Sequence, residues 1–122
     1  MSVTTFVKKA AQVRRDTFTR CHDGEGDLAC RLVLEKPDTA GRRVKFVHDD
    51  VLLPAVSIGV HRHEHDEEYY YILSGKGTMT LDGRTFEVGP GDIAAVYPGG
   101  AHGLANTGAE DLRLIVFCAA AK

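Results

Sequence analysis

Tryptophan is absent from the 122-residue chain, cysteine occurs only three times, and the formal net charge is just -2. No apolar run approaches the roughly 18 to 20 residues that a membrane-spanning helix needs, so we expect no membrane segment. The N-terminus also lacks the apolar stretch of a secretory signal, which favours a cytoplasmic location. Because basic residues are not clustered, neither nucleic acid nor an anionic membrane is an expected partner.

The cysteines Cys21, Cys30 and Cys118 are odd in number and include no Cys-x-x-Cys pair. A disulfide framework is therefore not expected, and free or buried thiols are the simpler interpretation. Hydrophobic residues make up 43% and charged residues 26%, which is the balance of a soluble globular protein. The length suits one domain with a single core.

Glycine and proline divide the second half of the chain into short runs with period-two alternation or β-branched enrichment, which predicts an all-β fold. The turn signals Asp82-Gly83 and Gly89-Pro90-Gly91-Asp92 are expected to join antiparallel neighbours. The expected strands cover residues 31–35, 44–48, 55–64, 68–73, 77–81, 85–88, 93–96, 102–106 and 112–118.

Residues 1–29 show no clear strand pattern, and we interpret them as an N-terminal arm on a single barrel domain of residues 30–122. The arm is either extended or contains one short amphipathic helical face. That face would comprise Phe6, Val7, Ala10, Ala11 and Val13.

About eight short antiparallel strands in so compact a chain favour a double-sheet jelly roll or small barrel, which protects its sheet edges. Period-two alternation places His61 and His63 on the same face as Ser57 and Gly59. If this face lines the interior, the polar side chains meet inside the barrel.

The opposite faces of these strands are too apolar to be left in water, which predicts a homodimer. An alternative cover for them is the segment 1–29 of the same chain. These faces carry Val56, Ile58 and Val60 on one strand and Tyr69, Tyr71 and Leu73 on the next.

Three imidazoles and one carboxylate, from His61, His63, His102 and Glu68, form a candidate metal site. Two histidines one residue apart on a strand lie roughly 6 to 7 Å apart, close enough to share a cation. Mixed imidazole and carboxylate ligands suit a divalent transition ion, of which Mn, Fe, Ni or Zn is the expected cofactor, and exclude the thiolate class of structural zinc. A second possible set pairs His63 with His65.

These residues resemble the paired motifs of the cupins over about residues 50–118. The first motif is matched by His61, His63, Glu68 and Gly75, and the second by Gly91, His102 and Asn106. The resemblance implies a double-stranded β-helix, or jelly-roll, barrel with His61, His63, Glu68 and His102 as metal ligands. The pattern departs at two turn positions, where Ala55 replaces a glycine and Tyr97 replaces a proline.

The resemblance also implies a metal-dependent enzyme acting on a small molecule, and dioxygenase chemistry is favoured because no acid or base separate from the ligands is evident. Tyr70, which shares the face of Glu68, is the candidate catalytic residue and phenolic donor. The alternatives are a sugar isomerase or epimerase, and a non-catalytic module that binds a metal or a sugar-like ligand. A closed tetrahedral zinc site would instead be purely structural.

Overall fold

The computed structural model describes residues 3–121, which form ten β-strands and two short 3-10 helices, η1 (Ala10–Gln12) and η2 (Cys21–Asp23). The strands are β1 (Arg14–Thr19), β2 (Asp27–Leu34), β3 (Val44–Leu52), β4 (Ser57–Arg62), β5 (Asp66–Ser74), β6 (Gly77–Leu81), β7 (Arg84–Val88), β8 (Ile93–Val96), β9 (Ala101–Ala105) and β10 (Leu112–Ala120).

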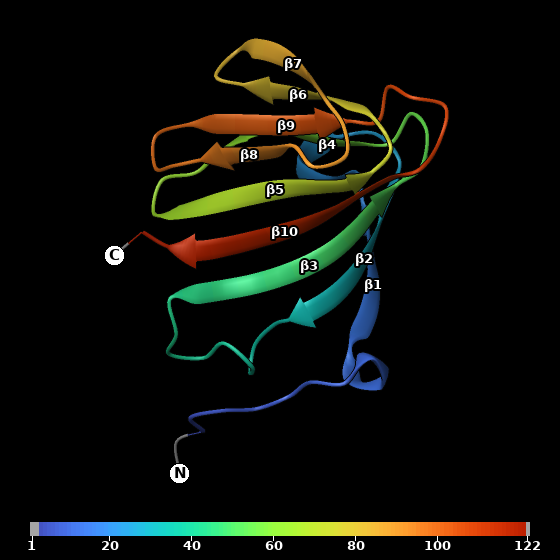
Figure 1. Ribbon diagram of the computed structural model, residues 1–122. Coiled ribbons are helices and arrows are strands. Elements are labelled where there is room, and N and C mark those ends of the chain that lie inside the picture. The colour runs from blue at the N-terminus through green and yellow to red at the C-terminus, as the bar shows by residue number, and fades with distance from the viewer. Residues whose placement is uncertain (1–2, 122) are drawn as a thin grey trace.

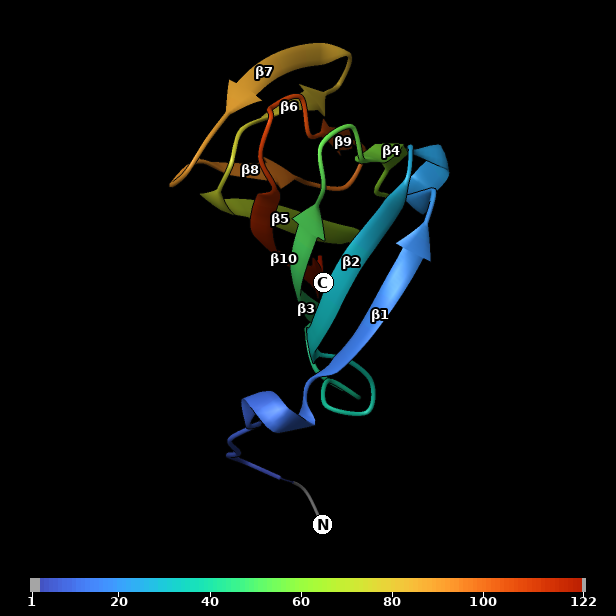
Figure 2. The same cartoon turned by 90° about the vertical axis from the view of Figure 1, so that its right-hand side faces the viewer.

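The strands form two antiparallel sheets, as expected of a jelly roll. The larger sheet has the order β1-β2-β3-β10-β5-β8, and the smaller has the order β4-β9-β6-β7. Figure 1 shows the smaller sheet above the larger one, and Figure 2 shows β1 and β2 at the side of the barrel. The all-β double-stranded β-helix predicted from the sequence is therefore confirmed.

The hydrophobic core lies between the two sheets and draws on both. Its most deeply buried apolar side chains come from strands far apart in the sequence, which ties the sheets together. They include Leu52, Ile72, Met79, Leu104, Leu112 and Leu114.

All nine expected strands are present, with ends shifted by a few residues. Asp82 and Gly83 both adopt positive φ and connect β6 to β7, as the two-residue hairpin requires. The expectation for the second turn was wrong. Residues Gly89 to Asp92 link β7 to β8, which lie in different sheets and do not pair.

The expectation of no strand before residue 31 was also wrong, because β1 forms over Arg14–Thr19 and β2 begins at Asp27. β1 pairs with β2 at the edge of the larger sheet. Only Phe18 in β1 is half-buried, and the remaining side chains are exposed on both faces. An edge strand exposed on both faces shows no alternation of apolar and polar residues in its sequence. In place of the helical face considered for this segment, the structure has only the short 3-10 helix η1 among residues 3–13.

The predicted outward direction of Val56 and Ile58 was wrong, since both are buried in the core. The register between β4 and β9 shifts between Ile58 and His61, where Gly59 and Val60 form a β-bulge. The extra residue moves Ile58 and His61 to the same face. Val60 remains outward and 59% exposed, as predicted.

Cys21, Cys30 and Cys118 are free, in agreement with the sequence analysis. Among residues 3–121, no helix is long and apolar enough to cross a membrane.

Candidate metal centre

The four predicted ligands lie on three neighbouring parts of the barrel. His61 on β4 stands directly opposite His102 on β9. His63 follows the end of β4, and its backbone is held by hydrogen bonds with Gly99 and Gly100. Glu68 lies on β5 with its side chain buried. Strand pairing thus brings His61 beside His102, and the packing of one sheet on the other adds Glu68.

The ligand atoms converge on one small volume. The Nε2 atom of His102 lies 3.1 Å from Nε2 of His63 and 3.1 Å from Nε2 of His61. The Oε1 atom of Glu68 lies 3.0, 3.3 and 3.8 Å from the Nε2 atoms of His102, His63 and His61. All four side chains lie within reach of a single ion.

These separations fit a transition metal. Metal–nitrogen bonds of about 2.1 Å put neighbouring ligand atoms about 3 Å apart, the spacing seen between the imidazoles. The set contains no thiolate and offers three nitrogens and one carboxylate oxygen, which suits Mn, Fe, Ni or Zn. The residues present therefore fit the expected divalent ion, and the donor set leaves its identity open.

Two of the imidazoles are oriented by partners on the ring nitrogen remote from the centre. Nδ1 of His61 donates a hydrogen bond to the carbonyl oxygen of Gly59 at 2.8 Å, because a carbonyl oxygen can only accept. Nδ1 of His63 donates to Oδ1 of Asp66 at 2.6 Å. Both contacts place the ring proton on Nδ1 and leave the Nε2 lone pair for a metal.

Asp66 is itself held in place by charge. Its other carboxylate oxygen accepts a hydrogen bond from Nζ of Lys45 at 2.8 Å. Burial opposes ionisation of Asp66, but hydrogen bonds from Lys45, His63 and Cys118 lower its pKa to about 2. The carboxylate is thus charged at neutral pH and fixes the orientation of His63.

The electrostatics of the centre also match a metal site. Burial opposes ionisation of Glu68, yet the surrounding imidazoles of His102, His61 and His63 lower the pKa of its carboxyl to about 2. Burial lowers the pKa of His102, which favours its neutral ring. A carboxylate and neutral imidazoles are the protonation states that metal ligands require.

Tyr70, the predicted catalytic residue, lies beside the centre with only 2% of its surface exposed. Its ring stacks on that of His102, with the ring centroids 4.5 Å apart. Burial raises the pKa of Tyr70 well above its ordinary value, so the phenol is neutral and able to donate. A catalytic role for Tyr70 stays a prediction.

A small cavity of about 120 Å³ opens beside Glu68 and Tyr70, inside the barrel. Drug-sized ligands occupy pockets of roughly 300 to 1,000 Å³, so this space suits a much smaller molecule. Its wall is largely aromatic and aliphatic with a few polar groups, and the lining residues are Phe18, Cys21, His22, Leu28, Phe46, His48, Asp50, Ile58, Glu68, Tyr70 and Val116.

Three polar residues of this cavity, His22, His48 and Asp50, were not predicted from the sequence. His22 on η2 stacks on His61, with ring centroids 3.6 Å apart. His48 and Asp50 occupy the same inward face of β3. The alternation of His48 and Asp50 was the available signal, but the expected strand ended at residue 48.

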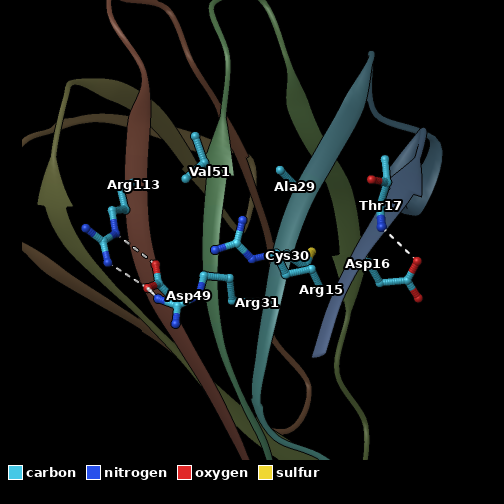
Figure 3. A pocket seen from close by; sticks show the side chains of 9 residues that line it. All are labelled: Arg15, Asp16, Thr17, Ala29, Cys30, Arg31, Asp49, Val51 and Arg113. Carbon is cyan, nitrogen blue, oxygen red and sulfur yellow. Dashed lines mark hydrogen bonds and ion pairs between the residues drawn. The ribbon is translucent and has the colours of Figure 1, made fainter. Parts of the chain in front are cut away.

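Other hollows of the surface lie away from the centre. A groove of about 630 Å³ crosses the outer face of β1, β2, β3 and β10, and none of the four residues of the proposed centre lines it. In that groove the guanidinium groups of Arg113 and Arg31 both bind Asp49 (Figure 3). Arg113 is therefore a surface residue, and so is Arg62, which donates to the carbonyl oxygen of Gly99.

His65 and Asn106 are not among the four residues that converge on the centre. His65 is exposed in the charged loop between β4 and β5, outside the group of four ligands. The buried amide of Asn106 donates to the carbonyl oxygens of Leu52 and Glu110, both at 2.8 Å. Asn106 thus fixes a corner of the barrel. Tyr97 does not line the cavity and lies edge-on to Tyr69.

Comparison with protein-family models finds a match to the Cupin domain over residues 50–118, more than half of the chain. The chain is a cupin. The matched segment begins at Asp50 on β3 and contains all four candidate ligands.

This cupin is 27% identical to the oxalate-binding protein of Thermotoga maritima over 112 residues, which cover 92% of each chain. A crystal structure from T. maritima, described as a predicted oxalate decarboxylase, superimposes with a TM-score of 0.86 at 25% identity. The match covers 94% of the cupin and 99% of that chain, so the N-terminal segment also has a counterpart there.

The polyketide cyclase RemF of Streptomyces resistomycificus shares the fold of the cupin. The TM-score is 0.73 at 24% identity, and the match covers 98% of the cupin and 81% of that chain. Because the identity is this low, the likeness concerns the fold alone.

Proposed function

We propose that this cupin binds a divalent transition ion through His61, His63, His102 and Glu68 and uses it to hold a short, oxygen-rich acid of the chemical class of oxalate. The observation that carries the proposal is the convergence of three Nε2 atoms and one carboxylate oxygen beside a small cavity. When bound, the ion supplies Lewis acidity toward a chelating ligand.

The residues of the chain divide the remaining work. Asp66 and Gly59 orient the imidazoles of His63 and His61. The hydrophobic wall of the cavity limits water beside the ligands, which strengthens polar interactions there. The cavity of about 120 Å³ favours a short acid over a sugar, and the resemblance to an oxalate-binding protein supports the same choice.

Dioxygen chemistry was favoured from the sequence because no separate acid or base was evident. Asp50 and His48 in the cavity remove that reason, since either could exchange a proton with a bound ligand. We therefore propose decarboxylation of the bound acid, in which a proton replaces the lost carbon dioxide, beside its oxidation by dioxygen as the two enzymatic outcomes. The name of the relative from T. maritima favours a second candidate, a module that binds the acid without turning it over.

The first experiment is elemental analysis of protein purified without chelator, beside a His61→Ala/His102→Ala variant. We expect close to one transition-metal ion per wild-type chain and almost none in the variant. Equal metal contents in both proteins would remove the basis of the proposal.

The second experiment is calorimetric titration of the metal-loaded protein with oxalate, malonate and glyoxylate, followed by assays for oxygen consumption and carbon dioxide release. Binding with turnover supports the enzyme, and binding without turnover supports the module. The proposal fails if none of the three acids binds.

A further inference from the structure

Asp50 is a buried carboxyl group without an adequate partner. Only 2% of the residue is exposed, and its Oδ1 atom is fully buried without a hydrogen bond. The nearest imidazole nitrogen, Nδ1 of His48, lies 3.9 Å from Oδ1, beyond hydrogen-bond distance. Buried polar atoms are almost always paired, so an unpaired one beside a cavity calls for an explanation.

The position of Asp50 directs the group into the cavity. Asp49 and Asp50 are neighbours on β3 and therefore face opposite sides of the sheet. Asp49 is on the outer side, where Arg113 and Arg31 bind it. Asp50 pairs across the sheet with Cys30 and Leu114, both of which are buried in the core, and it lines the same cavity as Glu68.

The surroundings of Asp50 favour a proton on it. Burial, with the help of the charges of Asp49 and Glu68, raises the pKa of Asp50 to about 7, although the neighbouring Cys30 thiol opposes the rise. The titratable groups around it are Cys30 on β2, His48 on β3, Glu68 and Tyr70 on β5, and Cys21 and His22 on η2. The facing residues of β10, Leu114 and Val116, are apolar.

Among residues 3–121, no lysine or arginine lines the cavity, so away from the metal an entering anion can be met only by neutral donors. We propose that Asp50 is a ligand-recognition residue that donates a hydrogen bond from its protonated carboxyl to the far oxygen of a small carboxylate held at the metal centre. This inference rests on the proposed function and adds to it the residue that selects an acid. The proton comes from solvent and is retained while the anion is bound, because an ionised Asp50 would repel it.

The test is calorimetric titration of manganese-loaded protein with oxalate at pH 8, in PIPES and in Tris. The two buffers differ in ionisation enthalpy, so the difference in apparent heat reports the protons taken up on binding. We expect wild type to take up a substantial fraction of one proton per oxalate. Asp50→Asn keeps a neutral donor of the same size and should bind within about threefold of wild type without that uptake.

Asp50→Ala removes the donor and should lose roughly tenfold in oxalate affinity, the effect of one hydrogen bond to a charged group. Asp49→Asn is the matched control, since it changes the adjacent aspartate on the outer face. It should bind oxalate within about threefold of wild type and still take up a proton, since the charge of Asp49 has only a minor effect on Asp50. Thermal unfolding of each variant checks that the barrel is folded, and manganese content checks that the centre is loaded.

The outcomes separate the two proposals. Oxalate binding that is unchanged in Asp50→Ala, or proton uptake that persists in Asp50→Asn, overturns the role of Asp50 and leaves the proposed function in place. Absence of oxalate, malonate and glyoxylate binding to wild type overturns the proposed function and this inference with it. Two manganese ions per chain, falling to one in Asp50→Ala, would assign Cys30, His48 and Asp50 to a second ion and overturn the inference as well.

Discussion

Ala55 adopts a left-handed backbone conformation with φ of 72°, at the position where the cupin motif has a glycine. A Cβ atom in this region costs roughly 1 to 2 kcal/mol, because it approaches the following carbonyl oxygen. The strained conformation of Ala55 persists because backbone hydrogen bonds hold Ala55 and the residue that follows it. The amide of Ala55 donates to the carbonyl oxygen of Asn106, and the amide of Val56 donates to that of Leu53.

Replacing Ala55 with glycine should therefore stabilise the protein. The relief of strain exceeds the added entropy of glycine in the unfolded chain, and we expect a net gain of about 0.5 to 1 kcal/mol. Urea unfolding monitored by circular dichroism measures this. Ala40→Gly, in the exposed loop before β3, is the control and should give no gain. A loss of stability in Ala55→Gly would contradict the assignment of strain.

Asp66 contacts no metal in the proposed centre and acts through His63. Removing a carboxylate that orients a metal-bound histidine typically costs 10- to 100-fold in metal affinity. We expect a loss of that size for Asp66→Ala, measured by competition with a chelating dye. Lys45→Ala removes the salt-bridge partner of Asp66 but keeps the contact with His63, so its loss should stay below about threefold. Equal effects would show that Asp66 does not orient the ring.

At the scale of elements, two glycines allow η2 to lie against β4. A Cβ atom on Gly59 would stand 1.9 Å from the carbonyl oxygen of His22, and one on Gly24 would stand 2.1 Å from that of Ser57. These contacts bring His22 over His61 and help to enclose the cavity. The close approach also places Gly59 in the bulge that turns Ile58 and His61 to the same side.

Gly59→Ala should separate η2 from β4, because the clash is with backbone and no side chain can move aside. We expect a loss of about 3 kcal/mol or more in the free energy of unfolding, together with weaker metal binding. Gly83→Ala is the control. Gly83 has φ of 80° with open space around it. The substitution should therefore cost only about 1 kcal/mol in the free energy of unfolding, and metal binding should be unchanged. Similar costs for the two variants would contradict the role of the close contact.

At the scale of the molecule, the barrel does not depend on the metal for its core. Its buried apolar side chains join both sheets independently of the four ligands. We expect the protein treated with chelator to stay folded but to melt at a lower temperature. Metal at one hundred times its dissociation constant should add about 2.7 kcal/mol of stability, measured from the shift in the unfolding transition. Complete unfolding on chelation would favour a structural zinc site instead.

The outer face of the larger sheet is apolar where β5 and β8 form it. Tyr71 on β5 is 40% exposed and lies directly opposite Ile93 on β8, which is 59% exposed. On the other side of Tyr71 stands Ile115 of β10. Residues 3–13 do not cover this face, since the larger sheet places β1 at the opposite edge from β8 (Figure 2).

A homodimer through this face therefore stays a prediction. Analytical ultracentrifugation at micromolar concentration should show a dimer for wild type and a monomer for Tyr71→Lys/Ile93→Lys, because burying two charges at an interface is costly. Phe86→Lys, on the exposed edge strand β7 of the smaller sheet, should remain dimeric. A wild-type protein that sediments only as a monomer would refute the prediction.

The sequence by itself determined the all-β class, nearly all the strands and the four candidate ligands. These features are local: alternation within a strand, turn residues between strands, and fixed intervals such as that from His61 to Glu68. Glu68, Tyr70 and Ile72 could be assigned to the interior in this way because β5 is regular around them.

Only the tertiary structure decided the features that depend on register between distant strands. The bulge at Gly59 and Val60 reversed the direction of Ile58, and exposed β1 joined the sheet without an alternating pattern. Asp50 became a cavity residue because β5 and η2 close over β3, which brings Glu68 and His22 into the same small space. Such contacts arise from chain closure, and no spacing along the sequence encodes them.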